Sequence, residues 1–337
     1  MKRWLSPLLM LVSLLGMTAC KKSEPTSRDV KVTTGSAPAA VVVDGGAASG
    51  SAGSDTAGSA GAAADPWKQQ AAPKDPLKAV LFWRAEKDGK TTYLLGTMHM
   101  GVDPEARLPQ VVWDKLDASK TFAMETDLSD PSLMSKMMRT KGSLKEDLGP
   151  DYWAKLEKAV GASLAKTMES MSPAMAGTMM ALQHLPKTAP MDGVLLGRAQ
   201  NQKKSIVYLE PAALQIEVLS KYMGLKALKM MIDMYEDSAA ETKRLLDAYV
   251  AGDPDALLKV TEKQKADALA HGFTEAEYAE QMNDMLYKRN ASWIEPIEKL
   301  HTAGDGFVAV GALHLVGPKS VLELLEKRGY KITRVAP

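Results

Sequence analysis

A short pattern occurs twice in this chain and decides its expected fold. It is Leu94-Leu95-Gly96-Thr97-Met98-His99 near the start of the folded part, and Val308-Ala309-Val310-Gly311-Ala312-Leu313-His314 near its end. Each copy is an apolar run, which predicts a buried strand, followed by Gly-x-x-His. Glycine permits a sharp turn or a close approach of the backbone, and the histidine then lies at the rim of the sheet, where open α/β folds bind ligands. Two copies at opposite ends of the chain indicate two halves that meet at one site.

Strand and helix signals alternate around both copies. Asp88-Gly89 lies between two β-rich runs and is a strong signal for a hairpin. Strands are predicted at Ala79–Glu86, Thr91–Leu95, Thr121–Glu125, Ser205–Glu210, Phe307–Val310 and Lys331–Val335. Helical patterns cover Leu108–Ala118, Leu133–Leu185 with breaks at Gly149-Pro150 and Ser172-Pro173, Met191–Gln202, Ala212–Gly252, Asp255–Leu269, Thr274–Ala303 and Lys319–Arg328. The predicted class is α/β, with two strand-rich halves, each ending a strand in Gly-x-x-His, and a mainly helical central insert.

The first 20 residues read as a targeting segment. Lys2 and Arg3 precede an apolar run from Trp4 to Met17, and Thr18-Ala19-Cys20 follows. The run has roughly 13 residues, fewer than the ~20 that a membrane-spanning helix needs. Met17–Cys20 resembles a bacterial lipobox, which implies that Cys20 becomes an acylated N-terminus and anchors the protein to a membrane outside the cytoplasm, at a periplasmic or outer surface.

Residues 21–75 are rich in Ala, Gly and Ser. Such a composition cannot bury enough apolar surface to offset the entropy of ordering, so we expect a disordered tether. Residues 76–337 remain as one α/β domain of ordinary size.

Composition excludes several classes of protein. Lys and Arg number 42 and Asp and Glu 41, so the chain lacks the basic excess of a nucleic-acid-binding protein. Its single cysteine excludes a disulfide framework and a cysteine-built zinc site. An enzyme built on histidines and carboxylates, or a binding domain, stays open.

Carboxylates follow two further strands. Glu125 ends one and Glu210 ends another, so both are expected near His99 and His314. Imidazoles and carboxylates together suit a divalent metal, or a general acid and base without one. Arg289, beside Asn290, could hold an oxyanion or a substrate carboxylate, although taken alone it reads as a surface salt bridge. The remaining histidines, His184, His271 and His301, have no repeated setting and are predicted to be structural.

These motifs resemble the TraB/PrgY/gumN family over about Leu77 to Val335. The resemblance rests on Tyr93–His99, Met124–Ser129, Tyr287–Asn290 and Val310–Pro318. The family groups with the Tiki proteases, which implies a fold like erythromycin esterase and the ChaN haem-binding lipoproteins. It also implies a divalent metal (Mn, Co or Zn) held by His99, Glu125 and His314, with Arg289 as a substrate or transition-state contact. Pro211 replaces the threonine that usually follows the family's Leu-Glu, at Glu210.

The leading functional prediction is a membrane-anchored, extracytoplasmic, metal-dependent hydrolase, most simply a peptidase acting on a peptide or small-molecule substrate. The catalytic residues would be Glu125, Glu210 and Arg289, with Glu210 or an unassigned group as the proton shuttle. No His-Glu-x-x-His occurs, so a zincin-type protease is excluded. Two alternatives stay open: a metal-free esterase-like hydrolase, and a non-catalytic lipoprotein that binds haem or a partner.

Overall fold

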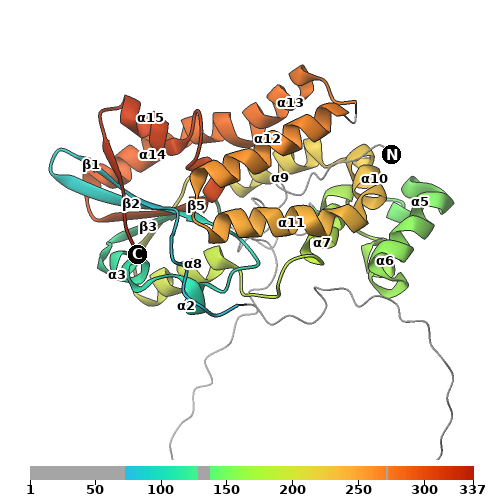
Figure 1. Cartoon of the computed structure of the whole chain (residues 1–337), viewed down its shortest axis with the longest axis horizontal. Coiled ribbons are helices and arrows are strands. Elements are labelled where there is room, and N and C mark those ends of the chain that lie inside the picture. Colours follow the sequence, from blue (N-terminus) through green and yellow to red (C-terminus); the bar gives the residue numbers. More distant parts are fainter. Residues whose placement is uncertain (1–72, 128–136, 271) are drawn as a thin grey trace, which may run out of the picture.

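The computed structural model describes residues 73–127, 137–270 and 272–337. The predicted signal peptide, almost all of the predicted tether and His271 lie outside these residues. Figure 1 shows a mixed sheet at one end of the molecule and a helical part that extends from it.

The sheet has six strands in the order β4-β3-β5-β2-β1-β6. The strands are β1 (Phe82–Lys87), β2 (Lys90–Thr97), β3 (Thr121–Met124), β4 (Ser205–Tyr208), β5 (Gly306–Gly311) and β6 (Lys331–Arg334). The four strands β4, β3, β5 and β2 are parallel, whereas β1 runs antiparallel to its neighbours β2 and β6. The predicted α/β class is therefore confirmed.

The hairpin forms where the sequence predicts it. Asp88 and Gly89 both have positive φ, 50° and 72°, as a type I′ turn requires, and Lys87 pairs with Lys90. The core of the sheet follows from its apolar strands: Phe82, Phe307 and Phe122 are fully buried, with neighbouring ring centroids 5.7 and 6.2 Å apart.

Helices cover both faces of the sheet (Figure 1). The α14 and α15 helices lie on one face and α3 and α8 on the other, and the other long helices form the helical part. The helices are α2 (Pro104–Arg107), α3 (Gln110–Ala118), α5 (Leu144–Val160), α6 (Ala162–Met168), α7 (Pro173–Leu182), α8 (Met191–Asn201), α9 (Ala212–Tyr222), α10 (Leu225–Asp233), α11 (Tyr235–Val250), α12 (Pro254–Ala270), α13 (Glu275–Met282), α14 (Lys288–Ala303) and α15 (Val321–Lys327), with a π-helical turn η1 (Asn283–Tyr287) and a 3₁₀ turn η2 (Ala312–His314).

Several predictions differ from the structure in detail. The helical residues come as two inserts, one between β3 and β4 and one between β4 and β5, instead of one central insert. The two Gly-x-x-His strands are neighbours in one sheet, as expected of motifs that meet at one site. The predicted helix Ala212–Gly252 is three helices, α9, α10 and α11, because the chain turns at Gly224 and Met234. The predicted helix Thr274–Ala303 is interrupted by η1. The β4 strand is partly exposed, since it forms an edge of the sheet.

Gly96 is required because β2 and the turn after β5 approach closely. A β-carbon built on Gly96 would lie 3.1 Å from Ala312 Cα and 3.1 Å from Leu81 Cβ. Tyr249 on α11 donates a 3.0 Å hydrogen bond to the Gly96 carbonyl from the helical side. The first motif glycine thus permits the close approach that the sequence suggested.

We expect Gly96→Ala to lower the free energy of unfolding by about 1–3 kcal/mol, because the added methyl overpacks a buried contact with backbone. Gly197→Ala is the matched control. Gly197 lies inside α8 with no atom within 4 Å of the added carbon, so this change should raise stability by about 0.5–1 kcal/mol. Urea unfolding measures both, and two effects of the same sign would contradict the packing described here.

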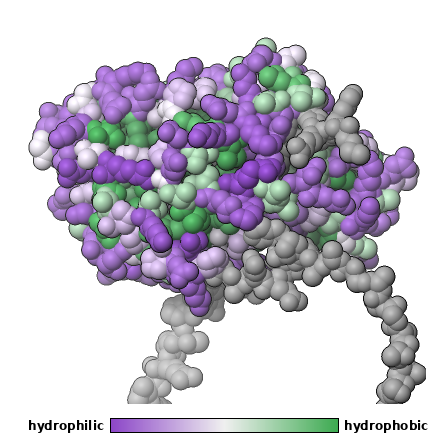
Figure 2. Space-filling model, in the orientation of Figure 1, coloured by the Kyte–Doolittle hydropathy of each residue, from purple (hydrophilic) through white to green (hydrophobic). Residues whose placement is uncertain are grey.

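The described surface is largely polar, with apolar residues scattered in small groups over the face in Figure 2. In the described part of the chain, no helix is long and apolar enough to cross a membrane.

Candidate functional site

The predicted site residues come together at the carboxyl ends of the parallel strands. His99 follows β2, Glu125 follows β3, Glu210 follows β4 and His314 follows β5. Arg289 joins them from α14. All five are buried, with His314 fully inaccessible to solvent and the others no more than 6% exposed. Open α/β folds bind ligands at this edge of the sheet.

Gly311 is the point around which both motifs meet. A β-carbon built on it would lie 3.2 Å from Glu125 Oε1, 3.6 Å from His314 Cδ2 and 4.0 Å from His99 Nε2. The Gly311 amide donates a 2.8 Å hydrogen bond to Glu125 Oε1. Any side chain at Gly311 would therefore fill the space between the two histidines and Glu125.

Arg289 joins the two glutamates. Its Nη2 lies 2.7 Å from Glu125 Oε2 and 2.7 Å from Glu210 Oε1, and its Nε donates to both Glu210 oxygens at 3.0 Å. Its Nη1 donates to the Met285 carbonyl at 3.0 Å and lies 3.4 Å from His314 Nε2. The interpretation of Arg289 as a surface salt bridge is wrong, because this ion pair network is buried.

The π-helical turn η1 immediately precedes Arg289. Within it the Lys288 amide donates to the Asn283 carbonyl, five residues earlier, instead of four. This extra residue rotates the start of α14 relative to α13, so that Arg289 and Asn290 are buried among the strand ends. Such turns occur frequently at functional sites.

Asn290 and Trp293 hold His314. The ring nitrogen Nδ1 lies 2.6 Å from Asn290 Oδ1, and the Asn290 amide nitrogen donates to the Lys319 carbonyl, which orients the amide. Because Oδ1 accepts, Nδ1 carries the proton, and in the neutral ring Nε2 has a lone pair. The Trp293 ring lies 4.4 Å from the imidazole. Burial and the nearby charges of Arg289 and His99 hold the pKa of His314 well below its ordinary value, so the ring is neutral.

Asp192 holds His99 in the same way. His99 Nδ1 is hydrogen-bonded to Asp192 Oδ2, and Thr97 donates to Asp192 Oδ1 at 2.8 Å. Burial raises the pKa of Asp192, but the His99 and Thr97 interactions outweigh it, so the pKa is lowered and the group is a carboxylate. A carboxylate only accepts, and His99 therefore donates through Nδ1 and turns Nε2 towards Gly311.

Two further polar residues adjoin Glu125. Gln215 on α9 donates to Glu125 Oε2 at 2.8 Å. Thr126 is 2% exposed, and its hydroxyl has no hydrogen-bond partner among the residues that the structure describes. Burial raises the pKa of Glu125, while Arg289, His99 and the Gly311 amide oppose the rise.

A known protein family matches the part of the chain that contains these residues. The model of the TraB/PrgY/gumN family matches residues 81–334, which span the sheet and every residue of this site. The chain belongs to the TraB/PrgY/gumN family.

Relatives of this TraB/PrgY/gumN protein include two proteins named "Uncharacterized protein YbaP". The protein from Shigella flexneri is 25% identical over 244 residues, which cover 69% of this chain and 87% of the relative. The protein from Escherichia coli K12 is 25% identical over 243 residues, with the same coverage. No solved structure matches the chain significantly.

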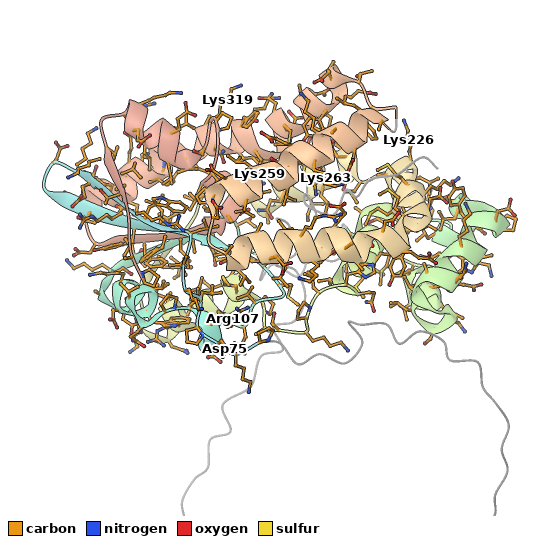
Figure 3. The ribbon with its side chains drawn as sticks, viewed as in Figure 1. Asp75, Arg107, Lys226, Lys259, Lys263 and Lys319 are labelled. Atoms are coloured by element: carbon orange, nitrogen blue, oxygen red, sulfur yellow. The ribbon has the colours of Figure 1, made fainter. Side chains whose placement is uncertain are left out.

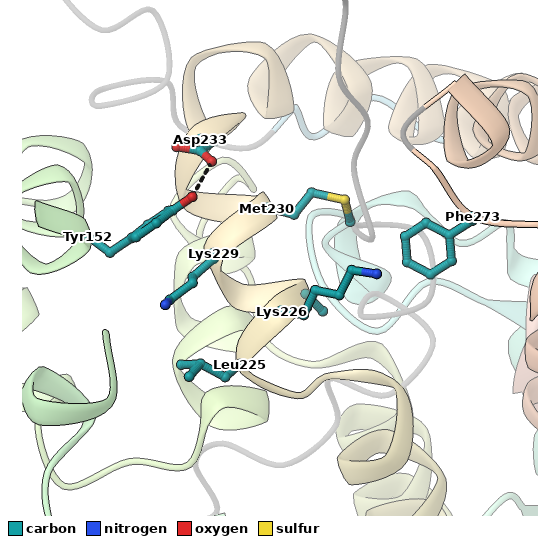
Figure 4. A pocket seen from close by; sticks show the side chains of 8 residues that line it. Tyr152, Leu225, Lys226, Lys229, Met230, Asp233 and Phe273 are labelled. Atoms are coloured by element: carbon teal, nitrogen blue, oxygen red, sulfur yellow. Dashed lines mark hydrogen bonds between the residues drawn. The ribbon is translucent and has the colours of Figure 1, made fainter. Parts of the chain in front are cut away.

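The remaining described histidines of this family member lie apart from the site. His301 lies 2.9 Å from the Thr92 hydroxyl and 3.0 Å from the Lys87 carbonyl, and His184 packs on Tyr235 with ring centroids 4.4 Å apart. A cavity of about 400 Å³ lies elsewhere, and no predicted site residue lines it. Its lining includes Tyr152 of α5 and Asp233 of α10 (Figure 4).

Low pH should destabilise the metal-free protein through His314. The unfolded chain binds a proton near pH 6.5, whereas the native imidazole binds it only at lower pH, so stability falls by up to about 1.4 kcal/mol per pH unit below pH 6.5 and is level above it. The pKa of Glu125 is raised in the folded protein, so proton uptake by Glu125 favours the folded state as the pH falls and opposes the effect of His314. The test therefore compares wild type with His314→Gln, both treated with a chelator, by urea unfolding at several pH values. The variant should show the shallower acid-induced loss, and equal slopes would contradict a neutral His314.

Proposed function

We propose that this protein is a metal-dependent hydrolase, most simply a peptidase, in which His99, Glu125 and His314 bind Mn²⁺, Co²⁺ or Zn²⁺. The observation that carries the proposal is the way both histidines are held. Each has Nδ1 engaged by an oxygen, from Asp192 or Asn290, and each directs Nε2 to the surroundings of Gly311 and Arg289. Histidines that bind metals through one nitrogen almost always donate the other N–H to such an acceptor.

The buried charge supports a divalent ion. In the described part of the chain, the cluster contains three carboxylates, of Glu125, Glu210 and Asp192, and one guanidinium, of Arg289. Metal ligation requires both imidazoles to be neutral, and in that state the cluster would carry two uncompensated negative charges in a buried site, which is costly. A divalent cation neutralises both.

The types of ligand and the net negative charge of the cluster suit a divalent metal, although the side chains do not lie close enough together to coordinate one. Among residues 73–127, 137–270 and 272–337, no three His, Cys, Asp or Glu side chains lie together closely enough to hold a metal ion. Both Glu125 oxygens already accept hydrogen bonds, from Arg289, Gln215 and Gly311. Each carboxylate oxygen has two lone pairs, so these bonds leave Glu125 able to act as a ligand.

The chain's own residues supply the rest of the mechanism. A bound divalent ion would lower the pKa of water and polarise a carbonyl group. Without a bound ion, Glu125, whose pKa is raised by burial, is suited to accept a proton at its carboxylate. Arg289 stabilises negative charge that develops on the substrate oxygen.

Glu210 has a different role from the predicted proton shuttle. Both its oxygens accept hydrogen bonds from Arg289, and Oε2 also accepts one from Trp293 at 3.0 Å. Glu210 therefore positions Arg289 and compensates its charge.

The direct hydrogen bond between His99 and Asp192 favours a second candidate, a metal-free esterase-like hydrolase. In it Asp192 orients His99 as a general base, as in a catalytic triad. The same residues would then act without a metal.

The proposed enzyme acts in the bacterial cell envelope and is anchored through an acylated Cys20, as the N-terminal sequence indicates. An erythromycin esterase/ChaN-like arrangement of the fold is part of the same proposal. Cys20→Ala should release the protein from the membrane fraction or leave it as a precursor, and unchanged fractionation would remove the anchor from the proposal.

The activity test uses the purified full-length protein with Mn²⁺ or Co²⁺ and two sets of substrates, unstructured peptides and p-nitrophenyl esters. We expect peptide hydrolysis that a chelator abolishes, that added metal restores, and that His314→Ala lacks. Ester hydrolysis that persists in chelator would instead support the metal-free candidate.

A further inference from the structure

Gln215 is a polar residue on the buried face of α9. It is 5% exposed and shares that face with Ile216 and Leu219. Polar side chains of a helix usually face solvent, as those of Lys226 on α10 and Lys259 on α12 do (Figure 3). Because burying an amide is costly unless it is hydrogen-bonded, the position of Gln215 requires partners at the strand ends.

Only one side of the Gln215 amide is satisfied within the described residues. Its Nε2 donates to Glu125 Oε2 at 2.8 Å. A carboxylate only accepts hydrogen bonds, so the amide nitrogen faces Glu125 and the carbonyl oxygen Oε1 is left for another donor. In the described part of the chain, no group donates to Oε1. A buried carbonyl oxygen in this state indicates a position where a ligand supplies the donor.

The unsatisfied oxygen lies at the site. The oxygen and nitrogen of a side-chain amide are ~2.3 Å apart, so Gln215 Oε1 lies within about 5 Å of Glu125 Oε2. The Nη2 atom of Arg289 donates to the same Glu125 oxygen at 2.7 Å. A guanidinium and an amide carbonyl oxygen therefore flank one oxygen of Glu125.

The start of α9 connects this amide with the surface. Glu210 and Gln215 are both buried, but Pro211, Ala213 and Leu214 between them are exposed, Leu214 to 36%. A substrate that contacts Leu214 from the solvent side is therefore one residue away from the Gln215 amide.

A peptide group matches the pair of groups beside Glu125. In a trans peptide the carbonyl oxygen and the N–H point in opposite directions. With the carbonyl oxygen towards Arg289, the N–H would face Gln215 Oε1. An ester has the carbonyl oxygen but no N–H, and the same holds for the amide bond before proline.

We propose that Gln215 binds the N–H of the scissile peptide bond and makes the site selective for amides that carry an N–H over esters and tertiary amides. This inference rests on the proposed hydrolase function and names its substrate class. In the reaction, water adds as hydroxide to the carbonyl carbon, the C–N bond breaks with its electron pair on nitrogen, and the other proton of the water passes to that nitrogen. Throughout, Gln215 Oε1 holds the nitrogen beside Glu125 through its N–H.

The test uses the full-length protein with Co²⁺ and a peptide on which the activity test finds cleavage, together with the same peptide remade with an ester at the cleaved bond. Gln215→Met keeps the length of the side chain and removes the amide. Loss of the hydrogen bond to Glu125 slows both substrates alike, whereas loss of the acceptor slows only the substrate with the N–H. We expect kcat/KM to fall about tenfold more for the peptide than for the ester.

Gln264→Met is the matched control, because Gln264 is also a buried glutamine, 9% exposed, on α12 and outside the site. It should leave the ratio of the two kcat/KM values unchanged. If Gln215→Met does not fold, Gln215→Asn withdraws the amide by one methylene and should change the ratio in the same direction.

The possible failures are distinguishable. A protein that cleaves no peptide removes the hydrolase function, and this inference with it. A protein that cleaves the peptide, but in which the Gln215 variants slow peptide and ester by equal factors, overturns this inference alone.

Discussion

Arg289→Met should lower the free energy of unfolding by about 3–5 kcal/mol, because it leaves Glu125 and Glu210 buried without their counter-charge. Thermal and urea unfolding at neutral pH measure the loss. The variant should recover stability as the pH falls, since protonation of the two carboxyls removes the unpaired charges.

The control for this change is Arg328→Met. Arg328 is 62% exposed and lies 3.4 Å from Glu298, so its loss should cost less than about 1 kcal/mol. Combining Arg289→Met with Glu125→Gln and Glu210→Gln should restore part of the stability, because no buried charge is then unpaired. An Arg289→Met protein as stable as the Arg328→Met protein would contradict the buried network.

Asp192→Asn should weaken Co²⁺ binding by about 10- to 100-fold, the usual effect of removing the partner that orients a metal-binding histidine. The amide oxygen can still accept from His99 Nδ1, as Asn290 does from His314, but it lacks the negative charge that raises the basicity of the ring as a ligand. Titration of the full-length protein with Co²⁺, followed by visible absorption, measures the change.

Thr97→Val is the matched control for Asp192→Asn. It removes the 2.8 Å hydrogen bond to the other Asp192 oxygen but leaves the bond to His99, so it should change Co²⁺ affinity much less. If Asp192→Asn has the native circular dichroism spectrum and binds Co²⁺ with wild-type affinity, Asp192 does not contribute to metal binding.

Local patterns were sufficient to predict the strands and the convergence of the two motifs. Asp88-Gly89 predicts the hairpin because few residues tolerate positive φ at both turn positions. The strand-end positions of Glu125 and Glu210 predict their convergence, since the carboxyl ends of parallel strands meet at one edge. The burial of Arg289 could not be predicted from its neighbours along the chain, because its partners are 79 and 164 residues away.

Long-range contacts explain the residues that the sequence did not reveal. Asp192 lies in the first turn of α8, where an acidic residue has a local explanation in the helix dipole. Gln215 reads as an ordinary polar helix residue until the fold places it against Glu125. The π-helical turn before Arg289 has a continuous helical pattern, so the extra residue becomes visible only in the backbone hydrogen bonds.

Co²⁺ binding to the full-length protein tests whether the paired histidines hold a divalent metal, the claim on which the proposed function depends. We expect one Co²⁺ per chain with visible absorption bands. His99→Ala and His314→Ala should lose these bands, and His301→Gln, which changes a histidine outside the site, should keep them. Binding that both alanine variants retain would contradict the claim, as would a wild-type protein that binds no divalent ion or carries haem absorption instead.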